Sequence, residues 1–164
     1  MANSDTWLEA DRAEILRLHE LWMRANCGLH IDAMREVFVG GAHFQGFNLN
    51  GHTYFQFDEW AQLWTYLRTV MQMTDVVEQQ IINLEIRADT AYLTFEATAV
   101  VRALPHAEEK SSGLELPVEP ARLKFRGTEI YLREDENQRR NWKMWHCHYS
   151  AAAPSTEARP GFFT

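Results

Sequence analysis

Four ionisable side chains stand where they could support acid–base chemistry. Glu96 and Glu129 occur in apolar segments with the alternation of strands, and His146 and His148 lie two residues apart near the C-terminal end. Two carboxylates in one apolar cavity should raise the pKa of at least one of them through desolvation and repulsion. That carboxyl would be a poised general base or acid for proton transfer next to a carbonyl, and it would equally suit a cationic ligand. We therefore take these four as candidate catalytic residues.

The strand that carries Glu96 leaves its orientation open. Within 91–104, Thr94 and Glu96 share one face, while Phe95 and Ala97 share the other. One sequence does not reveal which face is concave. Glu96 therefore either enters a cavity or simply lies on the solvated face.

The two histidines project from the same side of one predicted strand. Three roles are open to them: an acid, base or hydrogen-bond donor, a zinc site with a nearby Glu whose third ligand we cannot place, or hydrogen bonds within the sheet and dimer contacts. Trp142 and Met144 are expected on the same side, and the opposite side holds Trp145, Cys147 and Tyr149. No metal is assigned.

Aromatic residues make up 12% of the chain, with six Trp, which suggests a large cavity wall or an adhesive interface. Phe44 is expected inside, Trp64 in the core and Trp22 at the pocket. The residues predicted to bind a ligand are Trp22, Phe44, Tyr54, Trp145 and Tyr149. The residues expected at the surface are His19, His30, His52 and His106.

Helical and strand-like periodicities divide the chain into an early helical part and a late β part. The segments with helical spacing are 11–27, 32–38 and the stripe from Trp60 to Met71 that Asp58 can cap. The segments read as strands are 42–47, 52–57, 77–87, 91–104, 121–133 and 141–150, with a turn at 48–51. This order predicts an α+β fold with helices on one face of a curved sheet. We expect one domain over 1–164, ordered over about 8–152, with a loop at 105–120 and a tail at 153–164.

Composition narrows the range of partners. The net charge of −7 argues against nucleic acid, and no apolar run approaches the roughly 20 residues of a membrane span. The first eight residues have no signal-peptide core, and two cysteines cannot form a disulfide framework, so we expect a cytoplasmic protein. Because phosphate-loop, dinucleotide and nucleophile-elbow motifs are absent from the sequence, no cofactor is expected.

The final strand has the form Trp-x-x-x-His-x-His-x-Ser over 142–150. It resembles SnoaL-like members of the NTF2-like superfamily, and the pattern is closest to the association (hub) domain of calcium/calmodulin-dependent kinase and its bacterial relatives. Glu14-Ile15, Phe44 and Gly51 to Leu63 fit the same pattern. The resemblance implies a cone in which three helices close over a strongly curved mixed or antiparallel sheet, with a pocket at the open end and a homodimer through the convex face.

The same resemblance implies a choice of functions. The superfamily contains ketosteroid isomerase, scytalone dehydratase, polyketide cyclases, limonene-epoxide hydrolase and inert hubs. Glu96 and Glu129 match positions from which arginines enter the hub's pocket, so the pocket charge would be reversed here. We expect a domain that binds a small apolar or oxygenated organic molecule and acts as a cofactor-independent isomerase, cyclase or dehydratase. The alternative is a non-catalytic ligand-binding or oligomerisation module.

Overall fold

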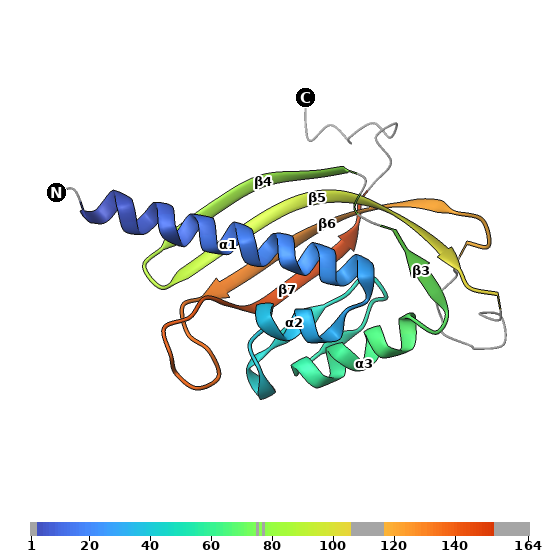
Figure 1. Ribbon diagram of the computed structural model, residues 1–164, viewed down its shortest axis with the longest axis horizontal. Helices are drawn as coiled ribbons and strands as arrows, with labels where there is room; N and C mark the ends of the chain where they lie inside the picture. The colour runs from blue at the N-terminus through green and yellow to red at the C-terminus, as the bar shows by residue number, and fades with distance from the viewer. Residues whose placement is uncertain (1–2, 75, 77, 106–116, 153–164) are drawn as a thin grey trace, which may run out of the picture.

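Three helices precede most of the sheet in a computed structural model that describes residues 3–74, 76, 78–105 and 117–152 (Figure 1). The helices are α1 (Asn3–Gly28), α2 (Ile31–Val37) and α3 (Phe57–Leu67), with a short 3₁₀ turn, η1, at Gly41–His43. The strands are β1 (Gln45–Phe47), β2 (Thr53–Tyr54), β3 (Met71–Met73), β4 (Glu78–Arg87), β5 (Thr90–Ala103), β6 (Ala121–Leu132) and β7 (Lys143–Ala151). No described helix is both long and apolar enough to cross a bilayer.

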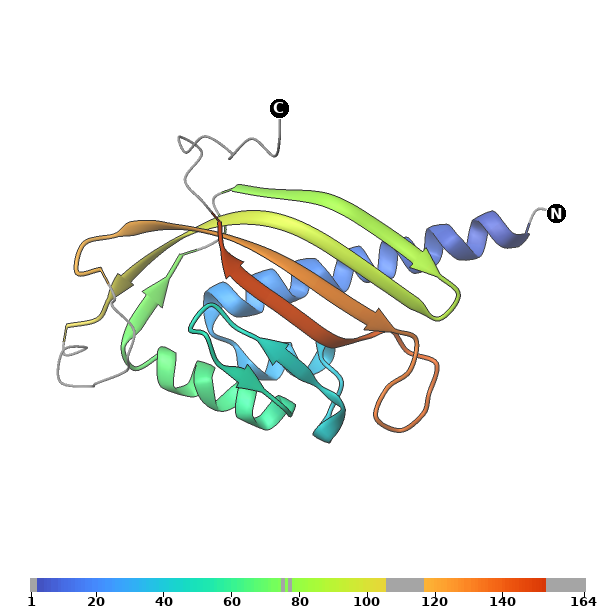
Figure 2. The same ribbon diagram turned by 180° about the vertical axis from the view of Figure 1, so that it is seen from behind.

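The seven strands of the described residues form one mixed sheet in the order β2-β1-β7-β6-β5-β3, with β4 also paired to β5 (Figure 2). The β1–β7 pair is parallel, and every other pair is antiparallel. β3 pairs with the end of β5 and β4 with its beginning, so both strands follow the same edge. The long central strands β5, β6 and β7 thereby provide the surface on which a site can be built.

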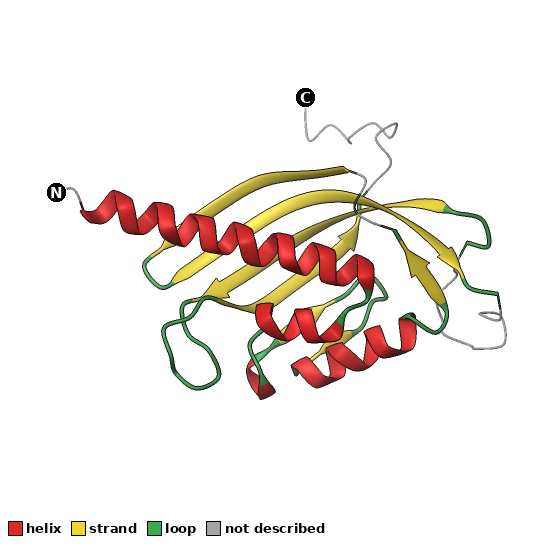
Figure 3. Ribbon diagram, viewed as in Figure 1, coloured by secondary structure: helices red, strands yellow, loops and turns green. Residues whose placement is uncertain are grey.

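The helices lie together on the concave face of the curved sheet (Figure 3). Along β5, alternate residues such as Leu93 and Phe95 are fully buried, because they face the helices. α1 contributes Ile15, Leu18 and Trp22 to the same core at helical spacing. The expected α+β architecture of three helices on a strongly curved sheet is confirmed.

Several boundaries differ from the sequence prediction. α1 begins at Asn3, eight residues earlier than expected, and Asp58 lies in the first turn of α3, whose N-cap is Gln56. Met71 was expected on the helical stripe but lies in β3, a strand of three residues that is too short to give a periodic signal. The turn at 48–51 is confirmed, with Gly51 at a φ of 79° that suits glycine. Most of the predicted loop, 106–116, and the tail, 153–164, lie outside the described residues.

Candidate functional site

A buried carboxylate lies on the concave face of β6, beneath α1. Glu129 is fully buried, and its Oε2 accepts hydrogen bonds from His19 Nδ1 at 2.8 Å and the Tyr131 hydroxyl at 2.7 Å. Its Oε1 accepts a third bond from the Tyr149 hydroxyl at 3.1 Å. A carboxylate can only accept, so three converging donors offset the cost of removing it from water. We call these four residues the Glu129 cluster.

The register of the sheet brings the cluster together. Glu129 and Tyr131 are two residues apart on β6 and so face the same side. Tyr149 on β7 pairs with Gly127, one step along the same face. A Cβ atom at Gly127 would come within 2.5 Å of the Phe95 ring and 2.7 Å of the Tyr149 ring, so glycine leaves the space that these rings occupy. The cluster therefore requires glycine at position 127 as well as its own four side chains.

His19 was expected at the surface, and that prediction is wrong. The side chain is 1% exposed and packs edge-on against Phe95 at 4.7 Å between ring centroids. With Nδ1 bonded to Glu129, its Nε2 faces the side-chain amide of Gln79, an exposed residue on β4. His19 follows Ile15 by four residues and precedes Trp22 by three, so the helical stripe offered a signal for its burial.

The phenols of the cluster are held in their protonated form. Burial, reinforced by the Glu129 carboxylate, raises the pKa of Tyr131 well above its usual value. Burial likewise raises the pKa of Tyr149, and the nearby Cys147 and Glu129 add to the shift. Both hydroxyls are therefore donors to the carboxylate at neutral pH. Burial also raises the pKa of the Cys147 thiol, which argues against a reactive thiolate.

A cavity of about 400 Å³ lies beside the cluster. Much of its wall is apolar, including Trp22, Leu63, Trp64, Leu67, Met71 and Phe125. The polar residues that line it are Asn26, Asn48, Asn50, Arg122 and Tyr149. Glu129 does not line this cavity among the described residues, so the cluster meets the cavity through Tyr149.

Two predicted ligand-binding residues, Trp22 and Tyr149, line the cavity and stack on each other at 5.9 Å between ring centroids. Trp64 was expected in the core; it is buried, but it also lines the cavity. The helical spacing of Trp64 predicts an apolar, buried face on α3, but it does not show that this face borders a cavity.

The structure does not bring the other three predicted ligand-binding residues to the cavity. Phe44 is buried as expected, but it packs in the aromatic core 5.4 Å from the Trp60 ring. The Tyr54 hydroxyl accepts a hydrogen bond from Asn50 Nδ2 at 2.8 Å, one layer behind the cavity wall. Trp145 is a half-buried residue whose Nε1 donates to the Glu134 carbonyl at 2.8 Å.

The expectation that Glu96 shares a cavity with Glu129 is wrong. Neighbouring Phe95 and Ala97 are buried, so Glu96 points to the opposite, outer face of β5. There its carboxylate pairs with Lys124 Nζ at 3.0 Å, and its side chain is 35% exposed. The alternation of residues along this strand had left two orientations open for Glu96, and the structure shows the solvent-facing one.

His146 and His148 also lie on the outer face, away from the cavity. Their rings contact Phe47 of β1 edge-on at 5.2 and 5.5 Å between centroids. Partial burial, together with His148, lowers the pKa of His146. Met144 was expected beside them but is fully buried on the inner face, because an irregularity in the β6–β7 register lies between Met144 and His146. In the described part of the chain, no three His, Cys, Asp or Glu gather closely enough to hold a metal ion.

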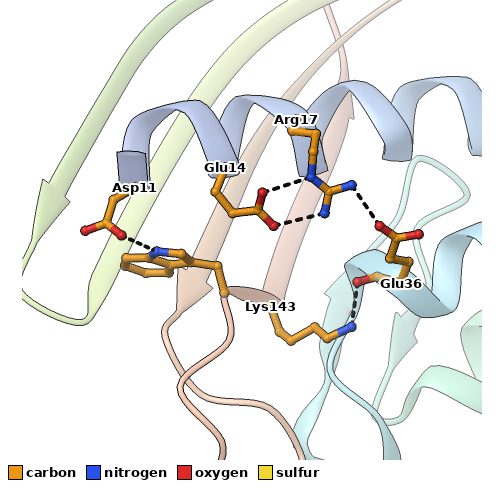
Figure 4. Close-up of polar contacts among 6 residues, drawn as sticks. Asp11, Glu14, Arg17, Glu36 and Lys143 are labelled. Atoms are coloured by element: carbon orange, nitrogen blue, oxygen red, sulfur yellow. Dashed lines mark hydrogen bonds and ion pairs between the residues drawn. The ribbon is translucent and has the colours of Figure 1, made fainter. Parts of the chain in front are cut away.

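A second, polar cleft of about 480 Å³ lies where α1, α2 and the 133–142 loop meet. Arg17 pairs with Glu14 at 2.8 Å and Glu36 at 2.7 Å, and these carboxylates raise its pKa (Figure 4). The Lys143 ammonium donates to the Glu36 carbonyl at 2.5 Å, and Asp11 accepts from the Trp142 indole at 3.0 Å. These charges already bond to one another, so this surface joins α1 and α2 to β7.

The fold of this chain is shared with known protein structures, although its sequence matches none of the known families. No family model and no curated protein matches the chain. Among solved structures, an NTF2-like superfamily protein from Salmonella enterica superposes with a TM-score of 0.69 at 12% identity, covering 94% of this chain and 99% of that one. A ketosteroid isomerase-like protein from Erwinia carotovora gives 0.65 at 12% identity, with 87% and 96% covered.

A third structure, from Thiobacillus denitrificans, bears the name of a calcium/calmodulin-dependent protein kinase type II association domain. It superposes with a TM-score of 0.58 at 13% identity, covering 83% of this chain and 93% of that one. The chain thus has the NTF2-like fold, as its last strand suggested. At identities this low the superpositions establish a shared fold only, and function must be argued from the site.

Proposed function

We propose that this protein binds a small, largely apolar organic molecule in the cavity beside the Glu129 cluster. The observation that carries the proposal is the cavity itself, about 400 Å³ in volume and walled by Trp22, Trp64 and aliphatic side chains. Ligand pockets in proteins span roughly 300–1,000 Å³ and combine apolar walls with a few polar groups. Burial of an apolar ligand here would supply most of the binding free energy.

A fluorescence titration tests the proposal. The neutral apolar dye N-phenyl-1-naphthylamine should bind the wild-type protein with an increase in its emission. Leu63→Trp places a larger side chain on the cavity wall and should weaken binding roughly tenfold or more, because it fills the space that the dye needs.

The matched control is Ile82→Trp, which adds the same ring at a position that is 60% exposed on β4 and does not line the cavity. It should leave dye affinity unchanged. Equal affinities for the wild type and both variants would place the bound dye elsewhere and would contradict the proposal.

Turnover is a second candidate function, supported by the double role of Tyr149, which lines the cavity and bonds to Glu129. A ligand proton would pass to the Tyr149 hydroxyl oxygen as the hydroxyl proton passes to Glu129 Oε1. The ligand becomes an anion, Glu129 becomes neutral and Tyr149 never ionises, in keeping with its raised pKa. Glu129 would thus act as the base of a cofactor-independent isomerase or lyase through an intervening phenol.

Proton exchange provides the test of turnover. The wild-type protein in D₂O should exchange the α-hydrogens of 1-indanone faster than buffer alone, followed by NMR. Tyr149→Phe and Glu129→Gln should each return the rate to that of buffer, while Tyr149→Phe still binds the dye. Exchange by the wild type at the buffer rate would argue for the non-catalytic ligand-binding module.

The homodimer and the cytoplasmic location remain predictions. The outer face of the sheet carries Phe47, His146 and His148, which would be available to a second copy. Light scattering at micromolar concentration should report the mass of two chains, and the mass of one chain would contradict the dimer.

A further inference from the structure

One amide in the cavity wall has its orientation set by a neighbouring side chain. Trp64 Nε1 donates a hydrogen bond to Asn26 Oδ1 at 3.0 Å. An indole N–H can only donate, so the oxygen of Asn26 must face Trp64 and the NH₂ group must point elsewhere. Turning the amide over would bring two donors together at Trp64, which is 3% exposed.

The NH₂ group of Asn26 donates to no acceptor among the described residues. Asn26 lies near the end of α1, is partly exposed and lines the cavity. Three other polar side chains of the wall are already engaged: Asn50 Nδ2 donates to Tyr54, Arg122 pairs with Glu78 at 2.6 Å, and the Tyr149 hydroxyl donates to Glu129. The remaining one, Asn48, accepts from the Leu49 N–H in the turn between β1 and β2. A donor held in a largely apolar wall favours a ligand that offers an acceptor to it.

From this geometry we infer that Asn26 selects ligands with a neutral hydrogen-bond acceptor, such as a ketone oxygen, and that Trp64 enforces the selection by fixing the amide. The inference rests on the proposed ligand-binding function and adds the chemical class of the ligand. A hydrocarbon of the same shape would fill the cavity but leave the amide donor unpaired. A site built to bond a polar group discriminates strongly against the analogue that lacks it.

Two probes that share a carbon skeleton separate the proposed ligand binding from the proposed selection of ligands by Asn26. Affinities for indane and 1-indanone are measured by displacement of N-phenyl-1-naphthylamine, and the ratio of the two dissociation constants is compared between variants. Asn26→Asp keeps an oxygen for the Trp64 N–H but replaces the donor with an acceptor. It should reduce the preference for the ketone, relative to wild type, by roughly tenfold, with indane affinity little changed.

Trp64→Phe tests the orientation rather than the amide. Without the indole N–H, the amide of Asn26 can turn either way, so the ketone preference should fall to a value between those of wild type and Asn26→Asp. The control is Asn83→Asp, which makes the same chemical change at an exposed residue of β4 that is not among the residues lining the cavity. It should keep the wild-type ratio.

The outcomes are distinguishable. An unchanged ratio in Asn26→Asp, with indane still bound, would overturn the role of Asn26 and leave the proposed function standing. Equal losses of ketone preference in Asn26→Asp and Asn83→Asp would also overturn it, since the effect would then be one of net charge. Failure of the wild type to bind either probe would overturn the inference together with the proposed function.

Discussion

Removing one hydroxyl from the Glu129 cluster should destabilise the fold by a predictable amount. Tyr131 is fully buried and donates to Glu129 Oε2 at 2.7 Å, and Tyr131→Phe deletes this bond while keeping the ring. A hydrogen bond to a charged group contributes about 1.5–3 kcal/mol. We therefore expect a loss of about 2 kcal/mol in the free energy of unfolding. For a chain of this size the melting temperature should fall by roughly 4–8 °C.

Urea unfolding followed by circular dichroism measures this loss, with Tyr92→Phe as the matched control. Tyr92 is 40% exposed, and its hydroxyl accepts from Asn83 Nδ2 at 2.9 Å at the surface. Its removal should change stability by less than about 0.5 kcal/mol. If Tyr131→Phe costs no more than Tyr92→Phe, the carboxylate does not need the Tyr131 hydroxyl, and the account of how Glu129 is buried fails.

Three further perturbations follow from the same contacts. Backbone hydrogen bonds, the largest from Arg139, lower the pKa of Asp135 below its usual 3.8, so its contribution to stability should be complete above that pH; the gap in urea midpoint between wild type and Asp135→Ala should close as pH falls below 3.8. Gly127→Ala should cost about 1–3 kcal/mol in thermal or urea unfolding, because its methyl group would collide with the Phe95 and Tyr149 rings. The raised pKa values of Tyr131 and Tyr149 mean that the unfolded chain ionises first near pH 10, so stability should fall above that pH, measured as melting temperature against pH.

The fold was predictable because its signals are local. Period-two alternation located the four long strands, and the spacing of Ile15, Leu18 and Trp22 located α1. Each of these signals depends only on neighbours along the chain. β3 was missed because three residues do not make a period, and the early start of α1 was missed because its first turns project past the sheet and show little apolar pattern (Figure 1).

The site was only partly predictable, since it depends on which face of the sheet the helices cover. Alternation separated the two faces of β5 but could not label the inner one, so both orientations of Glu96 stayed open, and only the family resemblance put it beside Glu129. The register irregularity between Ile130 and Tyr131 shifts the alternation of β7 and turns Met144 inward, and no residue in the sequence announces it. His19 could have been found from its helical spacing, but the identity of its partner, 110 residues away, is a tertiary property.

The Glu129 cluster and the cavity are coupled through a single ring. Tyr149 is fixed by its bond to Glu129, by stacking on Trp22 and by the space at Gly127, so its position sets part of the cavity wall. Tyr131 touches the same carboxylate but does not line the cavity. Changes at Tyr131 should therefore appear in stability alone, whereas Gly127→Ala, which displaces the Tyr149 ring, should alter stability and ligand affinity together. If the Glu129 cluster only stabilised the fold and did not shape the cavity, both kinds of change would affect stability alone.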